Sequence, residues 1–115
     1  MRERRGRRWL LLGVTALALA APARADVDGK AVYTKTCASC HGPDGKAATP
    51  AGKALKVMDL ATKHWASPDA IPEIAKVVRE GTAHMPSMAP KLKPEEIEAV
   101  ARYTQEMLAA GNPQQ

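Results

Sequence analysis

The chain has 115 residues, of which 45% are hydrophobic and 25% charged, and this size and composition indicate one small globular domain rather than a disordered tail or a multidomain enzyme. The formal net charge of +5 comes from the first 25 residues, which hold six arginines and one acidic residue, whereas residues 26–115 hold eleven basic and eleven acidic residues. The domain beyond this basic leader therefore has no excess of positive charge for a phosphate backbone, which argues against nucleic-acid binding.

Residues 1–25 have the pattern of a cleaved secretory signal peptide. Arginines dominate residues 2–8, residues 9–21 carry no charge, and residues 23–25 form a small-x-small sequence. An uncleaved membrane anchor is the alternative, but the uncharged run is shorter than the about 20 residues that span a bilayer. We therefore predict a mature domain over residues 26–115 in the periplasm, with no transmembrane segment after signal cleavage.

The first predicted element of this domain is a short helix over residues 28–36, which leads into a cysteine motif. Cys37 and Cys40 are the only cysteines, and His41 directly follows the second. This Cys-x-x-Cys-His pattern is typical of covalent attachment of a c-type haem. Two thiols on one short helical segment can bond to the vinyl groups of one porphyrin edge, and the next residue then presents an imidazole to the iron.

Three other interpretations of the two cysteines are a structural zinc half-site, a thioredoxin-like redox dithiol and a plain disulfide. Zinc needs about four ligands, and the sequence has no second Cys or His pair at finger spacing. A thioredoxin-like dithiol is expected near a βαβ pattern, which no segment shows. A disulfide is the default for two cysteines in an exported domain. The adjacent His41 and the export signal favour haem over all three.

The middle of the domain contains one clear helix. Residues 42–45 indicate a turn, and residues 47–66 give a mixed pattern with a short helical turn near residues 58–60. Residues 69–80 are predicted to be helical because apolar residues recur every three or four positions and Gly81 follows the last of them.

The loop that follows, residues 81–90, holds the candidates for a second axial iron ligand. Met85 is the predicted ligand, because Pro86 keeps the residue before it out of helical geometry and leaves the thioether free to point at iron. Met88 in the same loop is the alternative, and His84 leaves a bis-histidine haem open. Met107 falls in a helical repeat and is predicted to fill the core. A filled sixth position leaves mainly electron transfer, whereas an open one allows gas binding or catalysis.

The last predicted helix has Pro94 and acidic residues in its first turn and an apolar face along its length, and Gly111 follows its end. No segment has the pattern of a strand, so the domain is predicted to be all-α. Its only aromatic residues are Tyr33, Trp65 and Tyr103. Such a thin core needs the mass of a buried porphyrin, so we expect the haem-free chain to be poorly folded.

These motifs together resemble the class I cytochrome c family, in particular the small bacterial monohaem cytochromes, over nearly the whole of residues 26–115. The matching features are Cys37-x-x-Cys40-His41, Gly81-x-x-x-Met85-Pro86, and a closing helix with Leu92-x-x-x-Glu96-Ile97 and Tyr103. The resemblance implies a cytochrome c-like fold, with several short helices around one covalent haem c. It also implies that Gly29 and Tyr33 form the first-helix motif that the last helix, with Tyr103, crosses closely.

The resemblance assigns two further residues to the haem site. Pro50 is similar to the proline whose carbonyl accepts a hydrogen bond from the second ring nitrogen of the ligand histidine, here His41. Trp65 resembles the aromatic residue near the haem propionates, and the alternative is that it is a half-buried packing residue.

The function that follows is a periplasmic one-electron carrier with haem iron ligated by His41 and Met85. We expect a monomer whose redox partner proteins dock at the exposed haem edge, with Lys46, Lys53, Lys91 and Lys93 around it. Two alternatives stay open: a haem subunit of a larger oxidase or dehydrogenase complex, and an enzyme or sensor with an open iron site.

Overall fold

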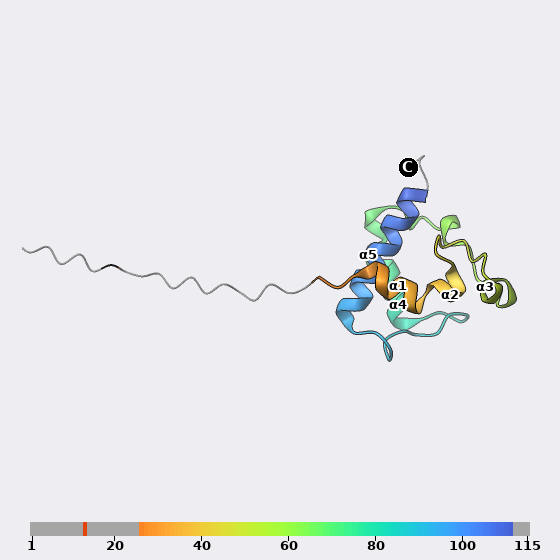
Figure 1. Cartoon of the computed structure of the whole chain (residues 1–115), viewed down its shortest axis with the longest axis horizontal. Coiled ribbons are helices and arrows are strands. Elements are labelled where there is room, and N and C mark those ends of the chain that lie inside the picture. Colours follow the sequence, from red (N-terminus) through yellow and green to blue (C-terminus); the bar gives the residue numbers. More distant parts are fainter. Residues whose placement is uncertain (1–12, 14–25, 112–115) are drawn as a thin grey trace, which may run out of the picture.

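The computed structural model describes Gly13 and residues 26–111 (Figure 1). The predicted signal peptide, apart from Gly13, lies outside these described residues. The elements are α1 (Gly29–Thr36), α2 (Ala38–His41), α3 (Pro50–Ala54), the 3-10 turns η1 (Leu60–Thr62) and η2 (Pro68–Ala70), α4 (Ile71–Glu80) and α5 (Pro94–Gly111). Residues 26–111 contain no strand, which confirms the prediction of an all-α domain.

Helix α1 has a defined beginning and end. The side chain of Asp28 accepts a hydrogen bond from the backbone N–H of Ala31 at 3.1 Å, which satisfies one of the unpaired donors of the first turn. At the other end, the N–H of Cys37 donates to the carbonyl of Tyr33 at 2.8 Å. The helix therefore ends at the first cysteine of the motif, as the sequence predicts.

Helices α1 and α5 cross in the middle of the domain (Figure 1). A Cβ added to Gly29 would lie 2.2 Å from the carbonyl oxygen of Ala99, so only glycine allows this approach. The rings of Tyr33 and Tyr103 pack at the same crossing, with centroids 5.4 Å apart and planes tilted by 56°. These contacts confirm the predicted Gly29 and Tyr33 motif.

The second main contact joins α4 to α5, and these two helices supply half of the buried core residues. Both helices present their predicted apolar faces to it: the buried members include Ile74, Ala75, Val78, Ile97, Val100 and Leu108. Full burial of a large aliphatic side chain contributes about 1.5–3 kcal/mol. The packing of α4 against α5 therefore contributes much of the apolar burial on which α1, α2 and the loops rest.

Helix α3 lies in the segment where the sequence pattern was mixed, and it was not predicted. Thr49 is its N-cap, because the hydroxyl oxygen accepts a hydrogen bond from the N–H of Gly52 at 2.9 Å. Pro50 follows at the first helical position, where its missing N–H costs nothing. The short turn expected near residues 58–60 is present as η1, which Asp59 caps.

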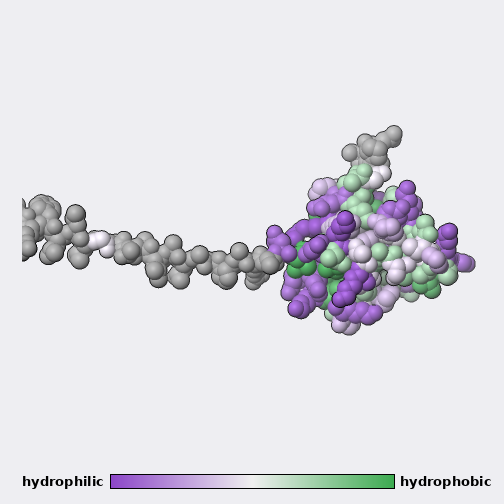
Figure 2. All heavy atoms as spheres, in the orientation of Figure 1, coloured by the Kyte–Doolittle hydropathy of each residue, from purple (hydrophilic) through white to green (hydrophobic). Residues whose placement is uncertain are grey.

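In the part of the chain that the structure describes, no helix combines the length and apolar character needed to cross a membrane. Figure 2 shows hydrophilic residues over much of the visible face of the domain, with smaller hydrophobic areas between them. Leu55 and Met58 are exposed large hydrophobic residues, at 69% and 52%.

Candidate functional site

The cysteine motif forms a single helical turn. The N–H groups of Cys40 and His41 both donate to the carbonyl of Cys37, at 3.2 and 3.0 Å. Gly42 then ends α2 with φ of 77°, a left-handed value that favours glycine, and its N–H donates to the carbonyl of Ala38. The two thiols and the imidazole are therefore held within five consecutive residues, the N-cap of α2 and the helix itself, as the motif predicts.

One small, mostly apolar pocket brings several of the predicted site residues together. Its wall includes Cys37, His41, Trp65 and Met85, with apolar side chains of α4 and α5 such as Ile74 and Val100. The sequence places these residues up to 63 positions apart, and the crossing of α1, α4 and α5 assembles them. Cys40 is half-buried on the same helical turn as Cys37 and is not among the residues that line the pocket.

His41 is half-buried in this wall, and burial lowers the pKa of its imidazole. The neutral imidazole, which lower pKa favours, is the form that binds metals. Its Nδ1 atom is buried and has no hydrogen-bond partner among the residues that the structure describes. Because an unpaired buried polar atom costs about 1–3 kcal/mol, this imidazole fits a site where a bound group engages the ring.

The hydrogen bond expected from His41 to the carbonyl of Pro50 is not formed in the structure, so this prediction is wrong for this conformation. The reason lies in α3: Pro50 is its first helical residue, and helical carbonyls point along the helix axis toward the residue four positions on. Thr49 instead ties the segment to the motif, because its hydroxyl donates to the carbonyl of Ser39 at 2.7 Å. A threonine followed by proline is an N-cap signal that could have identified this helix.

The state of the cysteines bears on the alternatives. Both thiols are free, so no disulfide joins Cys37 to Cys40. Burial, and secondarily the neighbouring Cys40, raises the pKa of the Cys37 thiol to about 11. Redox-active dithiols of the thioredoxin type have a lowered thiol pKa instead. Among residues 26–111, no three His, Cys, Asp or Glu side chains gather as a metal-binding group.

Met85 lies on a tight loop that begins directly after α4. The Thr82 hydroxyl oxygen accepts hydrogen bonds from the N–H groups of His84 and Met85, at 3.2 and 3.0 Å. The N–H of Thr82 donates to the carbonyl of Met85 at 2.8 Å. Gly81 has φ of 74°, and a Cβ there would lie 2.6 Å from the carbonyl oxygen of Met85, so this loop also requires glycine.

The other sixth-ligand candidates lie elsewhere. Met88 is buried in the hydrophobic core, with 7% of its surface exposed, and does not line the pocket. His84 is exposed. Met107 is partly buried against the core, as predicted for a residue that fills it. Of these side chains, only Met85 shares the pocket with His41.

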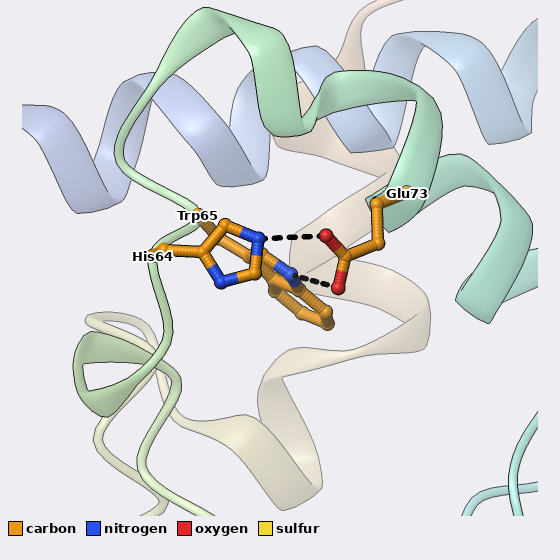
Figure 3. Close-up of polar contacts among 3 residues, drawn as sticks. All are labelled: His64, Trp65 and Glu73. Carbon is orange, nitrogen blue, oxygen red and sulfur yellow. Dashed lines mark hydrogen bonds and ion pairs between the residues drawn. The ribbon is translucent and has the colours of Figure 1, made fainter.

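Trp65 forms part of the pocket wall, and its polar edge is bound by a residue that the sequence did not indicate. The indole is 6% exposed, and its Nε1–H donates to Oε1 of Glu73 at 3.1 Å. The other carboxylate oxygen of Glu73 lies 2.7 Å from Nε2 of His64 (Figure 3). Glu73 is eight positions from Trp65 on a different element, so no local pattern could have paired them.

The pocket therefore offers the donors that a c-type haem needs: a thiol with a second one on the same turn, an imidazole, and a thioether, within an apolar wall. Soft sulfur and imidazole donors suit iron in a haem. The residues present fit the group that the motif predicts.

Comparisons with known proteins agree with this geometry. The family model described as cytochrome c oxidase, cbb3-type, subunit III matches residues 24–103. Cytochrome c6 of Nostoc sp. (strain PCC 7120) is 41% identical over 98 residues, which cover 82% of this chain and 85% of that protein. Cytochrome c6 of Microcystis aeruginosa is 38% identical over 76 residues, covering 66% of this chain and 89% of that protein.

A solved structure, titled KustC0563 c-type cytochrome, is similar with a TM-score of 0.60 and 30% identity, covering 70% of this chain and 98% of that one. The likeness extends to the helical fold around the site, because almost all of that protein is matched. The chain therefore belongs to the cytochrome c family, as a small monohaem class I c-type cytochrome that binds haem c covalently and carries electrons.

Proposed function

We propose that Cys37 and Cys40 hold the haem through two thioether bonds and that His41 and Met85 are the axial ligands of its iron. In each bond the thiol adds across one vinyl group, the sulfur joining one carbon and the hydrogen the other, so no atom is lost. The observation that supports this most is that Cys37 at the junction of α1 and α2, His41 at the end of α2, and Met85 on a distant loop line one pocket.

The proposed ligands suit an electron carrier. When bound, the haem supplies a one-electron couple between Fe(III) and Fe(II). His41 contributes a neutral nitrogen donor, since burial lowers its pKa, and Met85 contributes a soft thioether that favours the reduced iron and raises the potential. With both positions filled, the protein's residues leave no position for a substrate at the metal. Trp65 and the apolar residues of α4 and α5 exclude water from the pocket.

The choice of Met85 over Met88 is tested by two matched variants of the holoprotein. Met85→Ala is expected to abolish the far-red absorption band of iron–thioether ligation in the oxidised protein. Met88→Ala is expected to keep the band and to lose stability instead, by about 2–5 kcal/mol, because Met88 is buried in the core. If Met88→Ala loses the band and Met85→Ala retains it, Met88 is the iron ligand and Met85 is not.

The covalent attachment is tested by mass spectrometry of protein made in a host that matures c-type cytochromes. The expected mass includes one haem, and replacement of both Cys37 and Cys40 by Ala is expected to remove it. Two plain thiols, or a disulfide, in the wild-type protein would overturn the assignment of both cysteines.

We further propose that the carrier acts in the periplasm as a monomer and meets acidic redox partners at the haem edge. Lys46, Lys53, Lys91 and Lys93 are all exposed and are the proposed contacts. Contacts of this kind are brief and bury little area. Electron transfer to such a partner is expected to slow as ionic strength rises, because salt screens exposed charges. A rate that does not depend on salt would remove the lysines from the proposal.

A haem subunit of a larger oxidase complex is the second candidate function, because the matching family model is named for an oxidase subunit. A free carrier is expected to elute on gel filtration of native extract at the size of a single small domain. Co-elution of the haem with a large complex would favour the subunit instead.

A further inference from the structure

Glu73 binds two side chains at once, at the edge of the haem pocket. It lies in the first turn of α4, and its two carboxylate oxygens face the nitrogen atoms of two rings, Nε1 of Trp65 at 3.1 Å and Nε2 of His64 at 2.7 Å. Figure 3 shows both rings on the same side of Glu73, each directed at a different oxygen. Trp65 and His64 are adjacent in the chain, so one carboxylate fixes the whole turn that carries them.

The three residues differ in how they meet the solvent. Trp65 is buried and lines the pocket with His41 and Met85, whereas the side chains of His64 and Glu73 are 72% and 46% exposed. These three hydrogen-bonded residues therefore extend from the solvent-exposed surface to the wall of the pocket. A proton can reach His64 from the solvent, and the charge that it adds lies one residue away from the pocket wall.

We propose that Glu73 is a positioning residue that fixes Trp65 in the haem pocket, and that its ion pair with His64 makes the reduction potential of this cytochrome depend on pH. This inference rests on the proposed attachment of haem in the pocket. It differs from the expected role of Trp65, because the indole N–H is already bound by a carboxylate of the protein.

The direction of the effect follows from charge. A negative carboxylate near the pocket stabilises the more positive, oxidised state and so lowers the potential. Imidazoles gain a proton between about pH 8 and pH 5. Once His64 is protonated, its positive charge compensates that of Glu73, and the potential is expected to rise as the pH falls. By linkage, reduction of the protein also strengthens proton binding at His64.

Further charged groups lie in the loop before α4 and on the elements packed against it. Lys63 lies in the same loop as His64, with its Nζ 5.8 Å from the Trp65 ring centroid, and it also lowers the pKa of Glu73, after Trp65 and His64. The turn η2 contributes Asp69. Helix α5 contributes Glu98, which pairs with Arg79 of α4 at 3.6 Å. Of these groups, only His64 is an imidazole.

The experiment measures the midpoint potential of the holoprotein between about pH 5 and pH 8 in the wild type and three variants. The wild-type potential is expected to fall as the pH rises. His64→Gln is expected to remove the part of the slope that comes from His64. Glu73→Gln is expected to raise the potential at the alkaline end, where the charge of the carboxylate is not compensated. Glu80→Gln, at the far end of the same helix, is the matched control and is expected to keep the wild-type slope.

A second measurement follows Trp65 directly by NMR of its indole N–H. Glu73→Gln is expected to keep a shifted signal, because an amide oxygen still accepts the hydrogen bond, whereas Glu73→Leu is expected to move the signal toward that of a free indole. The positioning role is wrong if the signal in Glu73→Leu stays at its wild-type position.

The pH-dependent role is wrong if His64→Gln retains the full wild-type slope, since the haem carboxyl groups would then account for it. This failure is distinguishable from failure of the proposed function. If the far-red thioether band is present while His64→Gln leaves the slope unchanged, only the role of His64 and Glu73 falls. If the wild-type protein carries no covalent haem, the proposed function falls first.

Discussion

The two walls of the haem pocket are held in different ways. On the His41 side, the wall is held by a close backbone contact and by a buried side chain. A Cβ at Gly52 would lie 2.4 Å from the carbonyl oxygen of Cys40, and the Tyr33 hydroxyl donates to the carbonyl of Gly42 at 2.6 Å. On the Met85 side, a short loop is held by the hydroxyl of Thr82 and by backbone hydrogen bonds, among them that from the N–H of Thr82 to the carbonyl of Met85. The attachment wall therefore has little freedom to adjust, whereas the side-chain support of Met85 comes from one exposed residue, Thr82.

Removal of the haem is expected to have the largest effect, because the haem bridges both walls. In protein with both Cys37 and Cys40 replaced by Ala and no haem attached, we expect loss of cooperative melting, followed by circular dichroism. The aromatic part of the core consists of Tyr33, Trp65 and Tyr103, which leaves it thin when the pocket is not filled. Native-like helicity with a sharp melting transition in this variant would show that the fold is stable without the haem.

Gly52→Ala tests the rigidity of the attachment wall. The added methyl would meet the carbonyl oxygens of Cys40 and Ala47 at 2.4 and 2.5 Å, and backbone atoms cannot move aside cheaply. We expect a loss of about 2–3 kcal/mol in the free energy of unfolding, measured by denaturant titration of the holoprotein. The control is Gly111→Ala, where no atom lies within 4 Å and no loss is expected. Equal stability of the two variants would mean that α3 adjusts freely.

The attachment wall is also the part that the sequence predicts best. Cys37, Cys40 and His41 follow a local spacing on one helical turn, and the crossing at Gly29 and Tyr33 was expected from the resemblance and is present. Local spacing is sufficient there because hydrogen bonds between near neighbours fix the geometry.

Contacts between distant segments were not predictable in the same way. The partner of Trp65 could not be read from the sequence, because Glu73 reaches it only once η2 and α4 have formed. Similarly, the amide of Gln105 donates to the carbonyl of Ala66, 39 positions away, and no periodicity indicates such a bond. The expected Pro50 carbonyl bond failed because an unrecognised helix α3 directs that carbonyl elsewhere.

Thr82→Val tests the second wall and is expected to have a smaller effect on global stability, about 1 kcal/mol, because water can replace the lost acceptor in an exposed loop. The local effect is expected to be larger. Without the hydroxyl, the N–H groups of His84 and Met85 lose their partner, so the far-red band should disappear on heating well before the helices unfold. Thr82→Ser retains the hydroxyl and should keep the two transitions together. Coincident transitions in Thr82→Val would show that the loop is as firmly held as the attachment wall.

The smallest expected effect concerns Glu73 and the pH dependence of stability. Hydrogen bonds from Trp65 and then His64 lower the pKa of its carboxyl below the usual range. When the pKa of a carboxyl is lower in the folded protein than in the unfolded chain, the unfolded chain binds the proton more readily. The carboxyl therefore stabilises the fold at pH values above its pKa in the unfolded chain. This contribution is lost as the pH falls through its pKa in the folded protein. The stability difference between wild type and Glu73→Gln, measured by denaturant titration, should therefore be present at neutral pH and vanish in acid. It should be small, because His64 and Glu73 are largely exposed and water screens their pair. A difference that grows in acid would mean that the carboxyl is held in its protonated form, and the wall at Trp65 would then be neutral rather than charged.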